Sequence, residues 1–445
     1  MLVRQIEVST RQELESFIVR LGQDAAAART LSPRGLSRLI NVSQMDAREA
    51  AILRQELLTL GGEVAMNEEV ARRRSGKTDV IVLANLYQLV RLVPRLAGLS
   101  GQLPELGRDL ERLLEGWDHF VLPPLECGRF TLPVGAKTFV MGIINMTDDS
   151  FAGGGFLGEP QSAIERAERF IAEGADIIDI GGESARADVP AVRDDEEIER
   201  VIPVIQQLAP RIEVPISIDT YKPRVAEAAV RAGATMINDI SGLTLGTGTA
   251  DVAARYNVPL VLNHTYERPK VRPSTPPRYD DVMAAVIDFL GERIDMAQRA
   301  GVRLGQLILD PGVAFGKSHE QDLEVIRRLS ELRLLRRPIM LALSRKNFIG
   351  SVLGDPSEDR LEGTIAAASL GVASGADIVR VHDVREVARA IAIADAVVRP
   401  GGGRYAPSDS SWPRPAAAAG ENARPDAGSD RLPVRIQGSR ENLWR

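Results

Sequence analysis

The larger, C-terminal part of this sequence predicts a (β/α)8 barrel, a TIM barrel of the α/β class. Three observations lead to this prediction: eight short apolar runs follow one another between residues 137 and 381, longer amphipathic stretches separate them, and polar groups stand where each run ends. Such alternation is typical of parallel strands connected by helices. Eight units in roughly 260 residues match this barrel in number and length.

The eight predicted strands are short and rich in β-branched and other apolar residues. In order, they are residues 137–144, 175–180, 214–218, 234–238, 258–263, 306–310, 338–343 and 376–381. Nearly continuous apolar character indicates burial on both faces of the sheet. An open, doubly wound sheet is the structural alternative, but it would leave edge strands, and every run here has the composition of a buried one.

Helices are predicted between these strands because apolar residues recur there every three to four positions. The clearest predicted helices are residues 162–174, 198–209, 222–233, 281–301, 322–333 and 363–375. Several of them end at a glycine, such as Gly174 and Gly233, as expected just past a helix C-terminus.

Two further segments flank the barrel, which we place at residues 130–399. Residues 1–125 contain strand-like runs at 2–8, 36–42 and 79–86 and an amphipathic stretch at 47–62, which predicts a small α/β domain of unknown role. Residues 400–445 are rich in Gly, Pro, Ala and charge and show no apolar periodicity. Such a segment cannot bury enough apolar surface to offset the entropy cost of ordering, so we predict a disordered tail.

Charge and cysteine content restrict the classes of function. A formal net charge of -6 argues against a general nucleic-acid or membrane-surface binder, since both need a basic surface. Cys127 is the only cysteine, so the chain can form neither an intramolecular disulfide nor a thiolate zinc site. Charged residues interrupt the N-terminal segment where a signal peptide would be apolar, and no run of about 18 apolar residues occurs. We therefore expect a cytoplasmic protein.

The candidate site lies at the strand ends, because barrel enzymes hold their chemistry at the C-terminal face. The groups at these ends are polar and largely ionisable: Asn145, Glu183, Asp219, Asn238, His264, Asp310, the pair Ser344 and Lys346, and the pair Arg380 and His382. Ordinary loops would instead be dominated by small turn-forming residues. We interpret this ring of residues as an active site.

Two carboxylates and an amide in this ring predict the kind of ligand. Asp219 and Asn238 end adjacent strands, and Asp310 lies across the barrel mouth. Carboxylates can accept from the N–H groups of a flat, guanidine-like heterocycle, and an amide can donate and accept at the same ring edge. Paired carboxylates also fit glycoside hydrolysis, but such barrels usually have an aromatic-rich cleft, and only 4% of this chain is aromatic.

Cationic side chains follow the last three strands, where this barrel usually binds phosphate. They are Lys317, Arg345, Lys346, Arg380 and His382, and such groups would stabilise the charge of a departing pyrophosphate. The loop at residues 145–156 offers amide and carboxylate oxygens that can hold Mg²⁺, and its glycines would let it close over a polyphosphate. An acidic turn that caps a helix is the alternative interpretation of this loop.

Seven motifs occur in order at spacings compatible with the barrel: NMTDDSF, GADIIDIGGESAR, SIDT, INDISG, DPGVAFGK, SRKNFIG and RVHDV. Together they resemble the dihydropteroate synthase family over about residues 137–397. The resemblance implies a transferase of folate biosynthesis that joins 6-hydroxymethyl-7,8-dihydropterin pyrophosphate to para-aminobenzoate and releases pyrophosphate. It also implies Mg²⁺ as cofactor and a homodimer formed through helices on the outside of the barrel.

The resemblance also implies roles for individual residues. The pterin ring would be bound by Asp219, Asn238, Asp310 and Lys346. Pyrophosphate would be held by Asn145, Arg380 and His382, and Asn145 would also bind the metal. The aminobenzoate pocket would be formed by Phe151, Arg186, Phe315, Ser344 and Lys346. The catalytic residues would be Asp219, Lys346, Arg380 and His382.

The second loop departs from the family's usual motif. Residues 183–187 read Glu-Ser-Ala-Arg-Ala where Glu-Ser-Thr-Arg-Pro is common, so a hydroxyl and a stiffening proline are missing. Two alternatives therefore stay open. One is a homologue that binds pterin without catalysis, and the other is a pterin-dependent methyltransferase, which would need neither the pyrophosphate cations nor the SRK motif.

Overall fold

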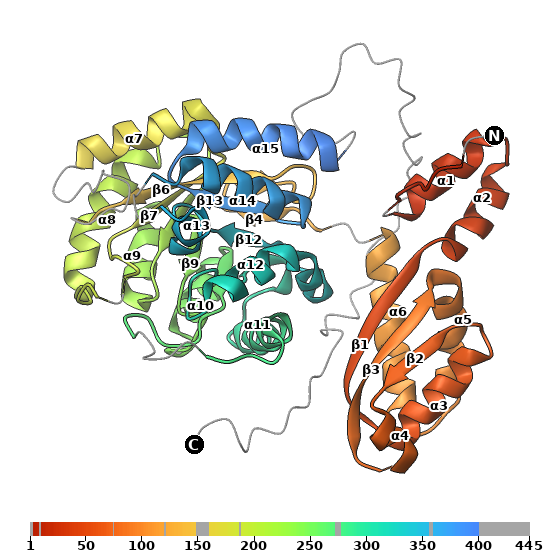
Figure 1. The fold of residues 1–445 in the computed structure, drawn as a ribbon. Helices are drawn as coiled ribbons and strands as arrows, with labels where there is room; N and C mark the ends of the chain where they lie inside the picture. The colour runs from red at the N-terminus through yellow and green to blue at the C-terminus, as the bar shows by residue number, and fades with distance from the viewer. Residues whose placement is uncertain are drawn as a thin grey trace. The chain divides into compact units, whose positions relative to one another are not determined.

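The computed structural model describes residues 3–8, 10–73, 75–119, 122–147, 160–186, 188–271, 277–355 and 359–399 (Figure 1). The predicted tail at 400–445 lies outside these residues, as do Phe151 and Ala187. The chain divides into two compact units between residues 119 and 122.

The first unit is a small α/β domain, as predicted. Its antiparallel sheet has the order β1-β3-β2, with β1 (Ser37–Asp46), β2 (Glu63–Met66) and β3 (Lys77–Asn85). Its helices are α1 (Arg11–Arg20), α2 (Ala25–Leu31), the short 3-10 helix η1 (Ser32–Arg34), α3 (Ala47–Leu58), α4 (Glu68–Arg73), α5 (Leu86–Ala97) and α6 (Leu103–His119). Side chains in β3 alternate between buried and exposed, which places Val80 and Val82 in one core with Leu53 and Leu89.

The local predictions for this domain are confirmed with one exception. The predicted strands at 36–42 and 79–86 and the helix at 47–62 correspond to β1, β3 and α3. The strand predicted at 2–8 is wrong, because residues 3–8 form no strand and Val3 and Ile6 are exposed. An apolar run becomes a strand only when a sheet edge pairs with it, and β1 pairs with β3 alone.

The second unit is the predicted (β/α)8 barrel. A small hairpin of β4 (Leu125–Cys127) and β5 (Phe130–Leu132) precedes eight parallel strands in the order β11-β10-β9-β8-β7-β6-β13-β12. A parallel bridge between Leu309 and Ile339 joins the two ends of this order and excludes the open-sheet alternative. The strands are β6 (Phe139–Asn145), β7 (Ile177–Gly181), β8 (Ile216–Asp219), β9 (Met236–Asp239), β10 (Leu260–Asn263), β11 (Leu307–Asp310), β12 (Met340–Ala342) and β13 (Ile378–Val381).

Helices surround these strands (Figure 1). They are α7 (Pro160–Glu173), α8 (Asp194–Leu208), α9 (Pro223–Ala232), α10 (Gly248–Tyr256), α11 (Val282–Arg299), α12 (His319–Arg327), α13 (Asn347–Leu353), α14 (Leu361–Ala373) and α15 (Val384–Val398), with 3-10 helices η2 (Leu304–Gln306) and η3 (Leu329–Leu335). The single helix predicted at 322–333 is divided between α12 and η3, because the backbone of Arg328 turns away from helical geometry at φ -100° and ψ 13°.

The barrel strands are buried on both faces, which explains their nearly continuous apolar sequences. All residues of β7, β9, β10 and β11 are buried. The buried carboxylate of Asp395 in α15 accepts hydrogen bonds from the backbone N–H of Thr138 (2.7 Å) and from its hydroxyl (2.9 Å), so the last helix is tied to the start of the first barrel strand. Within the described residues, no helix combines the length and apolar character needed to cross a membrane.

Candidate active site

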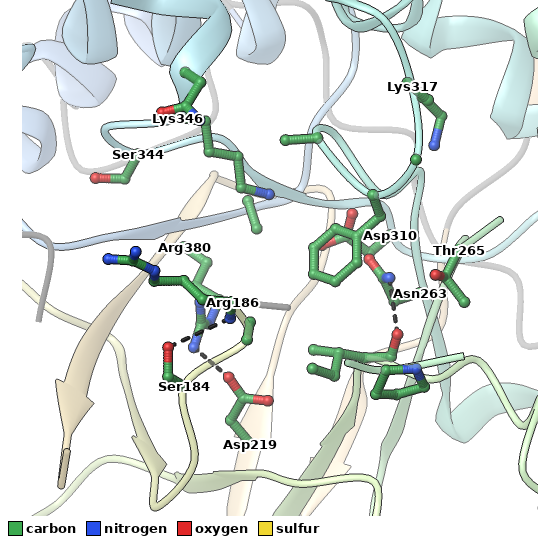
Figure 2. A pocket seen from close by; sticks show the side chains of 18 of the residues that line it. Ser184, Arg186, Asp219, Asn263, Thr265, Asp310, Lys317, Ser344, Lys346 and Arg380 are labelled. Atoms are coloured by element: carbon green, nitrogen blue, oxygen red, sulfur yellow. Dashed lines mark hydrogen bonds and ion pairs between the residues drawn. The ribbon is translucent and has the colours of Figure 1, made fainter. Parts of the chain in front are cut away.

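A cavity of about 790 Å³ opens at the C-terminal ends of the barrel strands (Figure 2). This volume suits a ligand of the size of a small organic substrate. Every predicted site residue that the structure describes lines the cavity: Asn145, Arg186, Asp219, Asn238, Asp310, Phe315, Ser344, Lys346, Arg380 and His382. Phe151 lies outside the described residues. Apart from His264, the predicted ring of strand-end residues therefore lines one cavity.

Arg380 lines the cavity and is bound by two carboxylates. Its Nε donates to Asp179 Oδ2 (2.7 Å) and its Nη2 donates to Asp219 Oδ2 (2.6 Å; Figure 2 shows the second pair). Burial raises the pKa of Asp219, and the guanidinium of Arg380 opposes this by favouring the charged carboxylate. Arg380 is thus held rigidly, but it is not a free cation.

Asp179 is a functional residue that the sequence analysis missed. It lies in the middle of β7, is 0% exposed, and accepts hydrogen bonds from both Arg380 and Asn238 Nδ2 (3.3 Å). A charged residue within the apolar run ADIIDI was the available signal, because a buried carboxylate needs a partner. Asn238 Oδ1 and Asp179 Oδ1 are buried without a hydrogen-bond partner in the described part of the chain. Asn238 lines the cavity, so its Oδ1 is an acceptor that a ligand can satisfy.

Asp310 and Lys346 form the opposite side of the site. The carboxylate of Asp310 is buried and accepts from the backbone N–H of Gly312 (2.7 Å). The Lys346 ammonium donates to the carbonyl of Val313 (2.6 Å) and lies 5.0 Å from the centre of the Phe315 ring. Burial lowers the pKa of Lys346 to about 8, and the nearby carboxylate of Asp310 favours its charged form. Lys346 is therefore charged at neutral pH and loses its proton in mildly alkaline solution.

Ser344 and His382 are joined directly. The hydroxyl of Ser344 accepts from the backbone N–H of His382 (3.2 Å) and lies 3.1 Å from its Nδ1. Burial, with a smaller contribution from the charge of Arg380, lowers the pKa of His382 to about 3. His382 is therefore neutral in the ligand-free site and acts there as a hydrogen-bonding group rather than as a cation.

Two other predicted cations, Arg345 and Lys317, form ion pairs or hydrogen bonds with neighbouring protein groups. Arg345 makes a bidentate ion pair with Asp383, with Nε–Oδ2 at 2.8 Å and Nη2–Oδ1 at 2.5 Å. Lys317 is buried, and its Nζ lies 2.8 Å from both His264 Nδ1 and the carbonyl of Gly312. His264 does not line the cavity, although its strand-end position suggested that it would. Of the predicted cations, Arg345 and Arg380 are therefore paired with carboxylates, whereas Lys317 and Lys346 form hydrogen bonds with uncharged groups.

The loop between β7 and α8, residues 182–193, forms one wall of the cavity. Arg186 pairs with Asp188 in the same loop, with Nε–Oδ1 at 2.9 Å, and its side chain is 38% exposed. Figure 2 shows Arg186 beside Ser184 on the side of Asp219 and Arg380. Arg186 thus reaches the cavity edge, where it can meet an anionic substrate, but its current partner is a protein carboxylate.

Comparisons with known proteins agree with this geometry. A family model described as "Pterin binding enzyme" matches residues 141–382, more than half of the 445 residues. The dihydropteroate synthase of Bacillus subtilis (strain 168) is 46% identical over 266 residues, which are 60% of this chain and 90% of that protein.

Solved structures of dihydropteroate synthases are also similar to this chain. A dihydropteroate synthase structure from Xanthomonas albilineans with 4-aminobenzoic acid is 41% identical with a TM-score of 0.57, covering 62% of this chain and 98% of that chain. A second structure from that organism, in complex with 7,8-dihydropteroate, is 40% identical with a TM-score of 0.56, covering 62% of this chain and 99% of that chain. On the motifs, the barrel and these similarities, the chain belongs to the dihydropteroate synthase family of pterin-binding enzymes.

Proposed function

We propose that this chain is a dihydropteroate synthase. It condenses 6-hydroxymethyl-7,8-dihydropterin pyrophosphate with para-aminobenzoate, and the products are 7,8-dihydropteroate and pyrophosphate, a step of folate biosynthesis. The observation that carries the proposal is the grouping of Asp219, Asn238, Asp310 and Lys346 around one cavity, with Asn238 Oδ1 buried and unpaired within the described chain. Xanthomonas albilineans dihydropteroate synthase structures hold 4-aminobenzoic acid in one case and 7,8-dihydropteroate in the other.

The pterin ring binds at the buried side of the cavity. Its N–H groups donate to the carboxylates of Asp219 and Asp310, and Asn238 pairs with the same ring edge through Oδ1. Because these acceptors are shielded from water, leaving them unsatisfied is costly, and a guanidine-like ring that satisfies them is selected over other flat ligands. Lys346 donates to a ring acceptor from the opposite side.

Pyrophosphate departs in a loose, dissociative step that leaves a resonance-stabilised cation at the pterin methylene group. The carboxylates of Asp219 and Asp310, next to the ring, stabilise the positive charge that spreads into it. Asn145, Arg380 and His382 contact the departing group. An anion beside His382 raises the pKa of its imidazole, so the neutral residue can gain a proton as the charge of pyrophosphate develops.

The acceptor binds at the outer side of the cavity. Phe315 supplies an apolar face, and Ser344, Lys346 and Arg186 supply donors for the carboxylate of para-aminobenzoate. Its neutral amine attacks the cation from this side, forms the new C–N bond and then loses one proton to the released pyrophosphate, so no protein nucleophile is needed. Exclusion of water by the surrounding loops protects the cation from hydrolysis.

Mg²⁺ is part of the proposal. This metal usually binds through one or two protein oxygens together with substrate phosphates and water, and Asn145 presents an amide oxygen to the cavity. When bound with the diphosphate, Mg²⁺ would neutralise charge on the leaving group. A chelator should therefore stop pyrophosphate release and added Mg²⁺ should restore it; release that is unaffected by chelation would remove the metal from the proposal.

Pyrophosphate release is the direct test of this function. The full chain with the dihydropterin pyrophosphate and Mg²⁺ should release pyrophosphate in a manner that depends on para-aminobenzoate. Asp310→Asn and Lys346→Ala should lower the rate by a factor of about 100 or more, since each removes a charged contact to the reacting ring. If pterin binds but no pyrophosphate is released, the chain is a binding homologue. If instead a methyl group is transferred from a methylated pterin, it is a methyltransferase.

We also propose a homodimer formed through the outer faces of α14 and α15. Leu370 is 63%, Ile393 is 68% and Val397 is 74% exposed, an unusual concentration of apolar side chains on a barrel surface. Val397→Asp should convert a dimer to a monomer in sedimentation velocity, because a buried unpaired carboxylate opposes association. A wild-type chain that sediments as a monomer at micromolar concentration would contradict this proposal.

The absence of a second cysteine, which leaves the chain without an intramolecular disulfide, supports a reducing compartment such as the cytoplasm. Burial raises the pKa of the Cys127 thiol to about 12, which leaves it unreactive. The proposed partners are the small-molecule substrates, and the net charge of -6 argues against nucleic acid or a membrane surface as further partners.

A further inference from the structure

Glu183, the first residue after Gly182 in the β7–α8 loop, connects this loop to the neighbouring β8–α9 loop. Its carboxylate accepts from the Tyr221 hydroxyl (2.8 Å), from Lys222 Nζ (2.5 Å) and from the backbone N–H of Val192 (2.8 Å). Tyr221 and Lys222 belong to the loop between β8 and α9, whereas Val192 ends the β7–α8 loop. The Glu183 side chain is only 6% exposed. One carboxylate therefore holds both ends of the β7–α8 loop and its neighbour together.

Lys270 joins this cluster from a third loop, the one between β10 and α11. Its ammonium donates to the backbone carbonyl of Ser184 and to that of Arg186 (3.1 Å), and it lies 3.6 Å from Glu183 Oε1. Ser184 and Arg186 are 86 and 84 residues away in the sequence. Lys270 is thus a bridge from the β10–α11 loop to the backbone of the segment that carries Arg186.

Charge balance gives a reason for a lysine at this position. Lys222 forms ion pairs with both Glu183 and Glu197 (2.5 and 2.6 Å), so these three groups alone would carry a net negative charge in a buried place. Lys270, whose side chain is 13% exposed, adds a second ammonium group, so that two carboxylates are balanced by two ammonium groups. A buried carboxylate without enough positive charge nearby is costly, so the second ammonium stabilises the cluster.

The backbone of Lys270 indicates that this contact is maintained against a local cost. Its φ is 68°, in the left-handed region that residues other than glycine rarely adopt. Such a conformation is unfavourable for a residue with a Cβ and is kept where surrounding contacts hold it. Here the contacts that can do so are the bonds of the ammonium to Ser184, Arg186 and Glu183.

We propose that Lys270 is a positioning residue for the acceptor: by holding the β7–α8 loop through its carbonyls, it places Arg186 at the cavity edge for the carboxylate of the aminobenzoate. This inference rests on the proposed function and deepens it. The bridge reaches the acceptor wall and does not touch Asp219, Asn238 or Asp310. Loss of the bridge should therefore affect the acceptor and leave pterin binding intact.

The test compares Lys270→Met, Lys270→Gly and Lys270→Arg with wild type in the full chain. Methionine keeps the length of the side chain without the charge, and glycine also relieves the left-handed backbone. Arginine keeps a donor that can reach the carbonyls. Arg299→Met, which removes an exposed cation from the outer helix α11, serves as the matched control for loss of charge, because Arg299 does not line the cavity.

Three quantities are measured: KM for para-aminobenzoate, Kd for the dihydropterin pyrophosphate, and hydrogen exchange in a peptide covering residues 184–192. Lys270→Met and Lys270→Gly should raise KM about tenfold or more, the usual effect of losing a charged hydrogen bond. Kd should stay within about twofold, because the ammonium of Lys270 bonds to the β7–α8 loop and not to the proposed pterin-binding side chains. Exchange at 184–192 should become faster, because the N–H of Val192 depends on the position of Glu183. Lys270→Arg should recover part of both effects, and Arg299→Met should resemble wild type.

The outcomes separate this inference from the proposed function. An unchanged KM together with unchanged exchange in Lys270→Met would overturn the role of Lys270. An equal loss of pterin affinity would also overturn it, since the residue would then act on the site as a whole. If wild type released no pyrophosphate in response to aminobenzoate, the proposed function would fail, and the exchange comparison would still decide whether Lys270 holds the loop.

Discussion

At the scale of single residues, the active site depends on groups whose charge is set by burial. Lys346 has the clearest consequence, because burial lowers its pKa to about 8. Below this pH the residue is a cation that donates to substrate, and above it the ammonium is lost. The kcat/KM for the dihydropterin pyrophosphate should therefore be constant in neutral solution and fall as the pH rises through about 8.

Lys346→Arg provides the control for this pH dependence. Arginine does not titrate in the accessible range, so any remaining activity of the variant should lack the alkaline decrease. The measurement is a kcat/KM profile of both proteins between neutral and alkaline pH. A decrease of the same shape in the arginine variant would assign the titration to another group, such as Lys317, whose pKa burial lowers to about 7.

At the scale of elements, the loops after β12 and β13 are joined by Arg345 and Asp383. This ion pair is mostly shielded, with the side chains 22% and 16% exposed, and Arg345 also has a left-handed φ of 59°. Arg345 directly precedes the cavity residue Lys346, and Asp383 directly follows the cavity residue His382. We expect Arg345→Met and Asp383→Asn each to lower kcat/KM, because either change removes a charged connection between the two loops and leaves the Ser344–His382 contact to hold them.

A double-mutant cycle measures this coupling. If the pair acts as a unit, the double variant should be little worse than either single variant, with a coupling energy of about 1–3 kcal/mol. Additive effects would show that the two residues act separately. Thermal unfolding of the same variants distinguishes a displaced loop from a destabilised barrel.

At the scale of the whole molecule, the chain contains two separate hydrophobic cores. The buried residues of the first unit, from Leu36 to Leu110, share no member with the barrel core, which begins at Val140. Each core contains enough buried apolar side chains to fold as a unit. A chain that begins at residue 121 should therefore fold and release pyrophosphate at a rate similar to that of the full chain.

Calorimetry and the release assay together test this independence. The full chain should show two unfolding transitions, and the shortened chain should keep only the one that belongs to the barrel. A folded but inactive barrel would mean that the first unit contributes to the reaction, although none of that unit's described residues lines the cavity.

Local patterns determined most of the fold. The eight barrel strands were predictable within a few residues, because burial on both faces imposes apolar runs that are visible in the sequence. The strand-end residues were predictable for the same reason, since a polar group that follows such a run must lie at the mouth of the barrel. The predicted strand at 2–8 failed because pairing with a sheet edge is not a property of the run itself.

The sequence by itself therefore determined the barrel, the ring of cavity residues and the resemblance to a pterin-binding family. Only the tertiary structure decided which charges in the site are free and which are paired. Arg380 meets Asp179, 201 residues away, and Lys270 meets Ser184 across 86 residues. Which residues become partners depends on how the strands close into a barrel and how the loops approach one another. The spacing of residues along the chain does not determine this.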